Sequence, residues 1–104
     1  MVSENVLAFQ KPDPAVVEEA RNAADITRRI RAGDSAAETS LVERYSNGLR
    51  YLLLRRTRDE QRAQDLLQDT FFIAITKLRD TDLDDPERLA GYLRGIAVRV
   101  ALNA

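Results

Sequence analysis

Side chains between residues 65 and 72 have the types and the spacing of a docking surface. Positions i, i+3, i+4 and i+7 of this stretch are Asp65, Gln68, Asp69 and Phe72. On a helix these positions project from one side. Two carboxylates, an amide and an exposed aromatic ring would suit a partner helix rich in arginine, because carboxylates accept paired hydrogen bonds from guanidinium groups. The alternative is an ordinary solvated face, with Phe72 packed against a neighbouring helix.

The same stretch has a second side made of apolar and small residues. We expect this side to face a core, and its members are Ala63, Leu67, Thr70, Phe71, Ala74 and Leu78. Neighbouring residues on a helix point about 100° apart. Phe71 and Phe72 therefore cannot both point fully inward, and the pattern predicts that one of them lies at the rim.

Composition excludes several kinds of chemistry. The chain has no cysteine and no histidine, so it cannot form a disulfide or a thiolate nucleophile, and it lacks the commonest general base and metal ligand. We therefore expect no catalytic residue, no metal and no cofactor. A carboxylate enzyme or a metal site would rest on the acidic stretch 80–85 alone. Such loops are usually solvated, and the spacing of a calcium-binding loop is missing.

The chain also shows no sign of a membrane segment. No apolar run approaches the roughly 20 residues that a membrane helix needs. The first residues are acidic and polar, without the basic start and hydrophobic stretch of a secretory signal. We expect a soluble, cytoplasmic protein with no membrane partner.

Residue usage predicts an all-α protein, a compact bundle of about four helices. The chain has 4 glycines and 3 prolines, and strong helix formers dominate it. Helices are predicted over about 13–31, 35–58, 59–79 and 85–104, after a loose leader over 1–12. The short connections favour antiparallel neighbours.

Start and stop signals support these boundaries. Asp13-Pro14 and Asp85-Pro86 both place a capping carboxylate before a proline, which is tolerated at the first helical position. Ser35 with Glu38 three residues later has the pattern of a capping box. Gly33 is expected to end the first helix in a left-handed conformation.

Charge is segregated along the chain. Residues 65–87 carry seven acids against Lys77 and Arg79, and residues 88–104 carry three arginines and no acid. A basic stretch consists of Arg50, Arg55, Arg56, Arg58 and Arg62 and is interrupted by two acids. The net charge of −1 hides this pattern, which suits a protein that holds two different partners. Gly48, just before the basic stretch, predicts a bend or a close helix contact.

Four motifs together resemble region 2 of bacterial sigma factors of the sigma-70 family, most closely the extracytoplasmic-function (ECF) group. Residues 65–71 (D-L-L-Q-D-T-F) are similar to the family's "D-L-V-Q-E-T-F" core. The stretches 31–37, 41–45 and 93–97 resemble its "R-A-G-D-x-x-A", "L-Y-x-R-Y" and "W-L-Y-R-I-A" motifs in the same order. The resemblance covers roughly residues 27–104.

This resemblance implies a transcription initiation factor without enzyme activity. The family's contact helix binds the clamp helices of the β′ subunit of RNA polymerase, and it corresponds to the helix that carries Asp65, Gln68 and Asp69. Phe72 belongs to the same expected polymerase-binding side. The resemblance allows an anti-sigma factor as a further partner.

The second implied partner is the promoter −10 element. In the family, the loop before the last helix (here about 79–85) and the last helix engage this DNA and hold a flipped base. The residues expected to bind DNA are Arg88, Tyr92, Arg94, Arg99 and Asn103. Arginine can neutralise phosphate, asparagine can pair with a base edge, and tyrosine can stack on an unpaired base.

The resemblance also implies a domain organisation. Residues 13–104 would form the region 2-like domain, and the C-terminal domain that reads the −35 element in the ECF group is not in this chain. The alternative function is a helical interaction or regulatory module that keeps this fold without promoter recognition.

Overall fold

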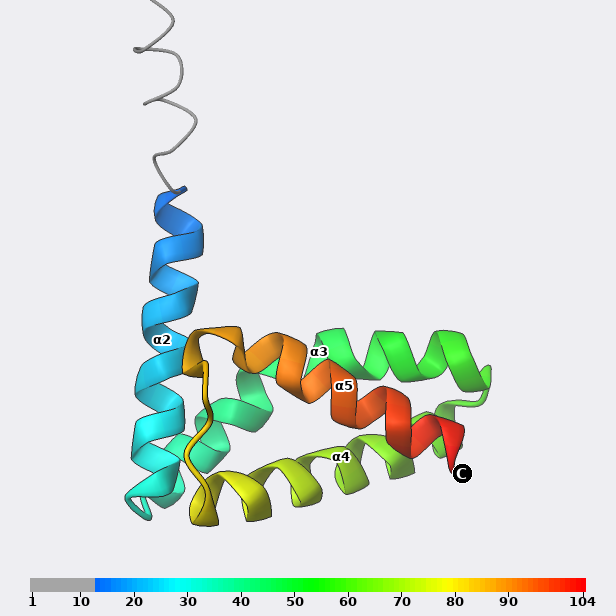
Figure 1. Ribbon diagram of the computed structural model, residues 1–104. Helices are drawn as coiled ribbons and strands as arrows, with labels where there is room; N and C mark the ends of the chain where they lie inside the picture. Colours follow the sequence, from blue (N-terminus) through cyan, green and yellow to red (C-terminus); the bar gives the residue numbers. More distant parts are fainter. Residues whose placement is uncertain (1–12) are drawn as a thin grey trace, which may run out of the picture.

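The computed structural model describes residues 13–104, and its regular elements are helical (Figure 1). In order they are α2 (Pro14–Arg31), α3 (Ser35–Thr57), α4 (Glu60–Asp80), the short 3-10 helix η1 (Pro86–Arg88) and α5 (Leu89–Leu102). The predicted all-α class with four α-helices is thus confirmed for this range. The predicted leader over 1–12 lies outside the described residues.

Helices α2 and α4 begin where the sequence predicted, and in each an aspartate caps the first turn. The Asp13 carboxylate accepts a hydrogen bond of 2.8 Å from the amide of Ala15, and Asp59 accepts one of 3.1 Å from the amide of Arg62. These bonds satisfy backbone donors that have no partner within the first turn of a helix. Both carboxylates therefore fix where α2 and α4 begin.

The expected capping box at the start of α3 is wrong. Asp34, not Ser35, is the N-cap, and its carboxylate accepts a hydrogen bond of 2.9 Å from the amide of Ala36. Glu38 does not reach back to the cap, because its carboxylate binds the Arg79 guanidinium at the end of α4, with the shortest N–O distance 2.6 Å. A tertiary ion pair has replaced the local hydrogen bond of the capping box.

The start of the last helix also differs from the expectation. The Asp85 side chain makes no capping hydrogen bond, and Pro86 opens the 3-10 turn η1 instead of an α-helix. The α-helical part, α5, begins only at Leu89, which is fully buried. Burial of this leucine, rather than a carboxylate cap, anchors the start of α5.

Both turns before α3 and α4 use left-handed backbone. Gly33 has φ +91°, as expected for the stop of α2. Arg58, which ends α3, has φ 55°, a conformation that a residue with a Cβ rarely adopts. The connection from α3 to α4 is therefore a tight turn, which lets α4 run back alongside α3.

Helices α3, α4 and α5 lie side by side, with α4 antiparallel to the other two, and α2 stands across them (Figure 1). The antiparallel expectation therefore holds for three helices and fails for α2. The buried residues of α2 begin only at Ala23, and its first turns project beyond the rest of the molecule (Figure 1). The core is formed mainly by leucine, isoleucine and alanine side chains of all four helices.

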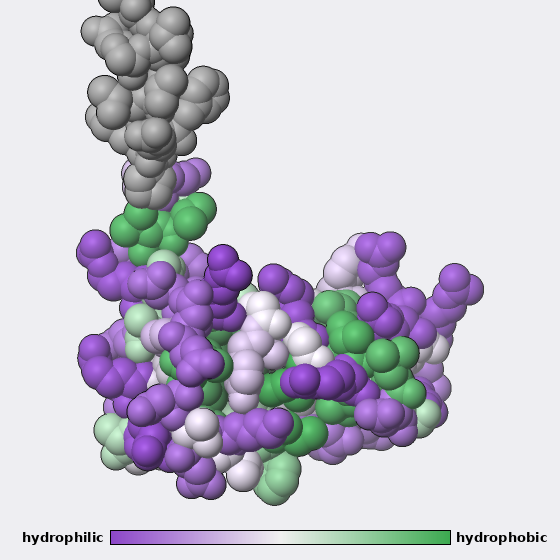
Figure 2. Space-filling view, viewed as in Figure 1, coloured by the Kyte–Doolittle hydropathy of each residue, from purple (hydrophilic) through white to green (hydrophobic). Residues whose placement is uncertain are grey.

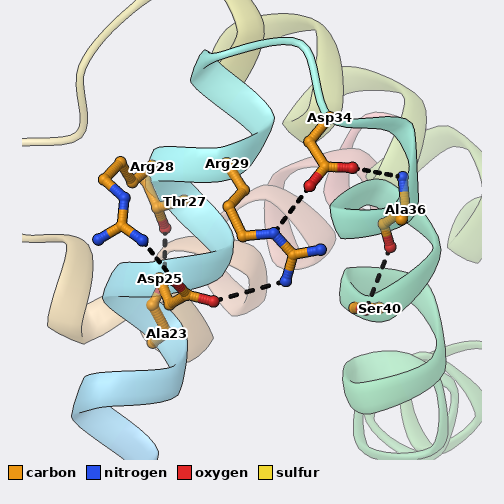
Figure 3. Close-up of polar contacts among 8 residues, drawn as sticks. All are labelled: Ala23, Asp25, Thr27, Arg28, Arg29, Asp34, Ala36 and Ser40. Carbon is orange, nitrogen blue, oxygen red and sulfur yellow. Dashed lines mark hydrogen bonds and ion pairs between the residues drawn. The ribbon is translucent and has the colours of Figure 1, made fainter.

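Polar contacts fix the corner between α2 and α3 (Figure 3). The Arg29 guanidinium lies between two carboxylates, 2.8 Å from Asp34 and 3.5 Å from Asp25. The hydrogen bond from Arg29 lowers the pKa of Asp34 below its usual value. Arg29 thus ties the cap of α3 to the preceding helix.

Gly48 was expected to mark a bend in α3 or a close helix contact. Gly48 makes no close helix contact, since a Cβ placed on it would meet nothing within 4 Å.

Among the helices of residues 13–104, none has the length and apolar character needed to span a lipid bilayer.

Candidate functional site

The expected docking side of α4 is exposed to solvent. Asp65, Gln68 and Asp69 are all exposed, and the Phe72 ring is 74% exposed. Phe71, the neighbouring aromatic, is buried with 6% exposure. The prediction that one of the two rings lies at the rim is confirmed, and the ring outside is the one that continues the polar stripe.

The core side of α4 explains this orientation. All members of the expected inward side are buried: Ala63, Leu67, Thr70, Phe71, Ala74 and Leu78. Leu66 is buried as well, which widens the packed side. This face packs against α3, α5 and α2, which fixes the rotation of α4 about its own axis. In that orientation the side with Asp65, Gln68, Asp69 and Phe72 faces solvent.

Most polar groups of the stripe have no internal partner. The Asp65 carboxylate accepts a hydrogen bond of 3.1 Å from the Gln61 side chain, one turn earlier in the same helix. Within the described part of the chain, Gln68 and Asp69 make no side-chain hydrogen bond or ion pair. Their acceptor groups are therefore free to bind a cationic partner.

The expected DNA-binding residues lie along η1 and α5. Arg94, Arg99 and Asn103 are exposed, and Arg88 is exposed but paired with Asp85 at 3.2 Å. Tyr92 is half-buried against the core, and burial raises the pKa of its hydroxyl. Tyr92 is thus less available for stacking on a base than the sequence suggested, whereas the three exposed residues are accessible.

A groove between α4 and α5 brings the two expected sites together. Its volume is about 410 Å³, and its lining residues are Leu66, Asp69, Ile73, Lys77, Ile96, Arg99, Val100, Asn103 and Ala104. Asp69, from the expected polymerase side, thus shares one groove with Arg99 and Asn103 from the expected DNA side. Opposite charges rim the groove, while its walls are partly apolar.

Sequence reasoning missed Ile73 and Lys77 in this groove. Both carry a signal that could have been used, because they follow Asp69 at spacings of four and eight and so continue its side of α4. Their neighbours on α5, however, depend on how the two helices pack. The periodicity of one helix does not reveal which residues of another helix lie opposite it.

The acidic loop after α4 is partly neutralised by arginines. Asp82 lies 3.3 Å from the Arg31 guanidinium, and Arg31 also donates a hydrogen bond of 3.1 Å to the Arg79 carbonyl oxygen. Asp85 pairs with Arg88. Across residues 13–104 no three histidine, cysteine or acidic side chains converge as metal ligands would. The loop is tied to α2 and η1 by ion pairs.

Comparison with known proteins gives one family. The family model "Sigma-70 region 2" matches residues 41–104, which is more than half of the chain. Searches among curated proteins and among solved structures gave no match. The matched range contains α4, α5 and most of α3, so it includes the exposed stripe and the groove. This protein therefore belongs to the sigma-70 region 2 family, the non-enzymatic, DNA-binding transcription factors that act with RNA polymerase core at initiation.

Proposed function

We propose that this protein is region 2 of an ECF-type sigma factor, and that it binds the β′ clamp helices of RNA polymerase through one side of α4. The contact surface, which we name the α4 stripe, consists of Asp65, Gln68, Asp69 and Phe72. The observation that carries the proposal is the exposure of all four, with Phe72 74% exposed on a helix whose other side is packed.

The chemistry of the α4 stripe suits a cationic helix. Gln68 and Asp69 have no side-chain partner within residues 13–104, so binding would not break an internal contact. Carboxylates pair with arginine in charge-assisted, often bidentate hydrogen bonds. Phe72 supplies an apolar anchor next to them, and aromatic anchors contribute strongly to protein interfaces.

We further propose that α5 binds the promoter −10 element. Arg94 and Arg99 would contact phosphates, and Asn103 would pair with a base edge, because these side chains are exposed on the last helix. Arg88 would reach DNA by exchanging Asp85 for a phosphate. Tyr92 is the weakest member of the set, since its ring is half-buried against the core.

The remaining parts of the proposal concern the whole chain. Residues 13–104 would act as one region 2 domain in the cytoplasm, where the polymerase works. An anti-sigma factor would act by covering the α4 stripe or the groove beside it. Either position would block polymerase or DNA.

The proposal is tested with the double variant Gln68→Ala, Asp69→Arg. Its affinity for a purified β′ clamp fragment should fall at least about tenfold, or about 1.4 kcal/mol of binding free energy. The matched control is Asn47→Ala with Glu43→Arg, which removes an exposed amide and reverses an exposed acid on α3. Thermal melting of both variants should stay close to that of the wild type.

Two outcomes contradict the proposal. One is an unchanged affinity of the α4 variant, and the other is an equal loss in the α3 control. If the wild-type chain captures no polymerase subunit from a lysate but retains another protein through the α4 stripe, the interaction-module alternative replaces it.

A further inference from the structure

Positive charge is also concentrated in the last two turns of α3 and the first turn of α4. This surface lies where α3 ends and α4 begins and carries Arg50, Arg55, Arg56, Arg58 and Arg62, all exposed. We name these five residues the basic end. The ion pairs within residues 13–104 use other arginines, namely Arg28, Arg29, Arg31, Arg44, Arg79 and Arg88. None of the five arginines of the basic end forms an ion pair in the described range.

The two acids that interrupt the basic end offset only part of its charge. The Asp59 carboxylate is engaged as the N-cap of α4, 3.1 Å from the Arg62 amide. Glu60 is exposed and forms no ion pair in the described range. Five guanidinium groups against two carboxylates leave this end positive, and such a cluster attracts a polyanion.

An exposed aromatic ring accompanies these arginines. Tyr51 is 64% exposed, and the Arg55 guanidinium carbon lies 5.8 Å from the centre of its ring. This distance is within the range of a cation–π interaction. The pair forms a flat platform on the surface, with a charge beside it.

The platform borders a hollow. A depression of about 510 Å³ is lined by Gly48, Tyr51, Leu52, Arg55 and Arg56. Gly48 lies one turn before Tyr51, and a Cβ on it would meet nothing within 4 Å. The glycine serves no packing contact here, and its missing side chain leaves the space beside the tyrosine ring open. That space suits a flat group stacked on the ring.

We propose that the basic end and Tyr51 bind single-stranded DNA, with the arginines on its phosphates and one base stacked beside Tyr51. Surfaces of this kind combine a positively charged path with aromatic rings on which unpaired bases stack. The inference adds a DNA contact on α3 to the one proposed on α5. It rests on the proposed function only for the source of the strand, a melted promoter.

An acidic protein segment is the competing occupant. It would satisfy the arginines, but it brings no flat group for the hollow beside Tyr51. The position of the surface also favours DNA, because the end of α3 and the end of α5 lie at the same end of the molecule (Figure 1). Figure 2 shows hydrophilic side chains around an apolar area there. One strand could therefore contact both helices.

The experiment measures binding of the 104-residue chain to a fluorescent oligo-dT strand by anisotropy, at several salt concentrations. The variant Arg55→Glu, Arg56→Glu should lose about tenfold or more in affinity, and the slope of log K against log salt should fall by about 1.4, two phosphate contacts at about 0.7 each. Tyr51→Ala should lose about fivefold or more. Gly48→Leu should weaken binding by filling the hollow, without lowering the melting temperature.

The matched control is Arg21→Glu with Arg28→Glu, which changes the net charge equally on α2. Its affinity should change less than about twofold at moderate salt. An equal loss in the control, or no binding by the wild-type chain, overturns the inference. Tighter binding of a poly-glutamate peptide than of oligo-dT also overturns it, in favour of a protein partner.

The two DNA proposals are separable. If Arg94→Ala with Arg99→Ala leaves oligo-dT binding intact while the α3 variants lose it, the α5 contact fails and this inference stands. If only the α5 variant loses binding, the inference fails and the proposed function stands.

Discussion

At the scale of single residues, Asp34 has two structural roles. Its carboxylate accepts the Ala36 amide at 2.9 Å and the Arg29 Nε at 2.8 Å. The first bond starts α3, and the second ties it to α2. One side chain thus stabilises a helix start and the angle between two helices.

We predict that removing this carboxylate lowers the melting temperature in a graded way. Asp34→Ala loses the cap and the ion pair and should melt a few degrees lower, the order expected for loss of an N-cap in a small domain. Asp34→Asn keeps an acceptor for the Ala36 amide and should lie between this variant and the wild type. Circular dichroism melting curves would measure the order.

The control for this prediction is Ser35→Ala. Because Asp34 is the N-cap and Ser35 is exposed, this change should leave the melting temperature nearly unaltered. If Ser35→Ala lowered the melting temperature as much as Asp34→Ala, Ser35 would be the true N-cap, as the sequence predicted.

This pair of residues also shows what local sequence can predict. Asp13 was identified as a helix start because it is a good capping residue followed by a proline. Asp34 and Ser35 are adjacent and both cap helices well, so sequence alone could not choose between them. The choice follows from Arg29, which binds Asp34 from the preceding helix.

At the scale of elements, α4 has two sides with different roles. Helical spacing predicted both the buried side and the exposed stripe, because a 21-residue helix with a continuous apolar side can pack in one rotation only. The groove beside it was not predictable, since its other wall comes from α5. The sequence of a single helix determines which side of it is buried. It does not determine how closely a second helix packs beside it.

The two adjacent phenylalanines of α4 give a direct test. Phe71→Ala should cost about 3–5 kcal/mol of unfolding free energy, because Phe71 is 6% exposed and its removal leaves a cavity. Phe72→Ala should change stability by less than about 0.5 kcal/mol, because its ring is 74% exposed. Urea denaturation would compare the two variants.

Phe71→Leu provides a milder substitution if Phe71→Ala does not fold. It should still be less stable than Phe72→Ala, since a smaller side chain fills the core less completely. Equal stabilities of the Phe71 and Phe72 variants would mean that α4 is rotated differently from the arrangement described here.

At the scale of the whole molecule, ion pairs between distant segments attach α2 and the acidic loop to the other helices. Glu19 of α2 binds Arg44 of α3 at 2.5 Å and accepts the Tyr45 hydroxyl at 2.7 Å. Burial, followed by this hydrogen bond, raises the pKa of Tyr45 to about 12. The sequence could not predict such pairs, because partners 25 residues apart meet only in the folded chain.

The pair between Glu38 of α3 and Arg79 of α4 should make stability depend on acid. Two hydrogen bonds of 2.8 and 2.6 Å join the groups, and the bond from Arg79 is the main cause that lowers the pKa of Glu38 below its usual 4.5. An unfolded chain therefore binds this proton more readily than the folded chain does. The stabilisation is fully present above about pH 4.5 and is lost as pH falls through the lowered value.

We therefore predict that Glu38→Gln melts a few degrees below the wild type at pH 7, and that the difference shrinks as the pH falls below about 4.5 and through the lowered pKa of Glu38. Arg79 is 54% exposed, so water screens the pair and the difference stays small. Glu43→Gln serves as the control, since the Glu43 carboxylate forms no ion pair within residues 13–104. A difference for Glu38→Gln that stays constant as the pH is lowered until the protein unfolds would show that the charge on Glu38 does not stabilise the fold. Packing of the side chain would then explain its effect better than the tie between α3 and α4.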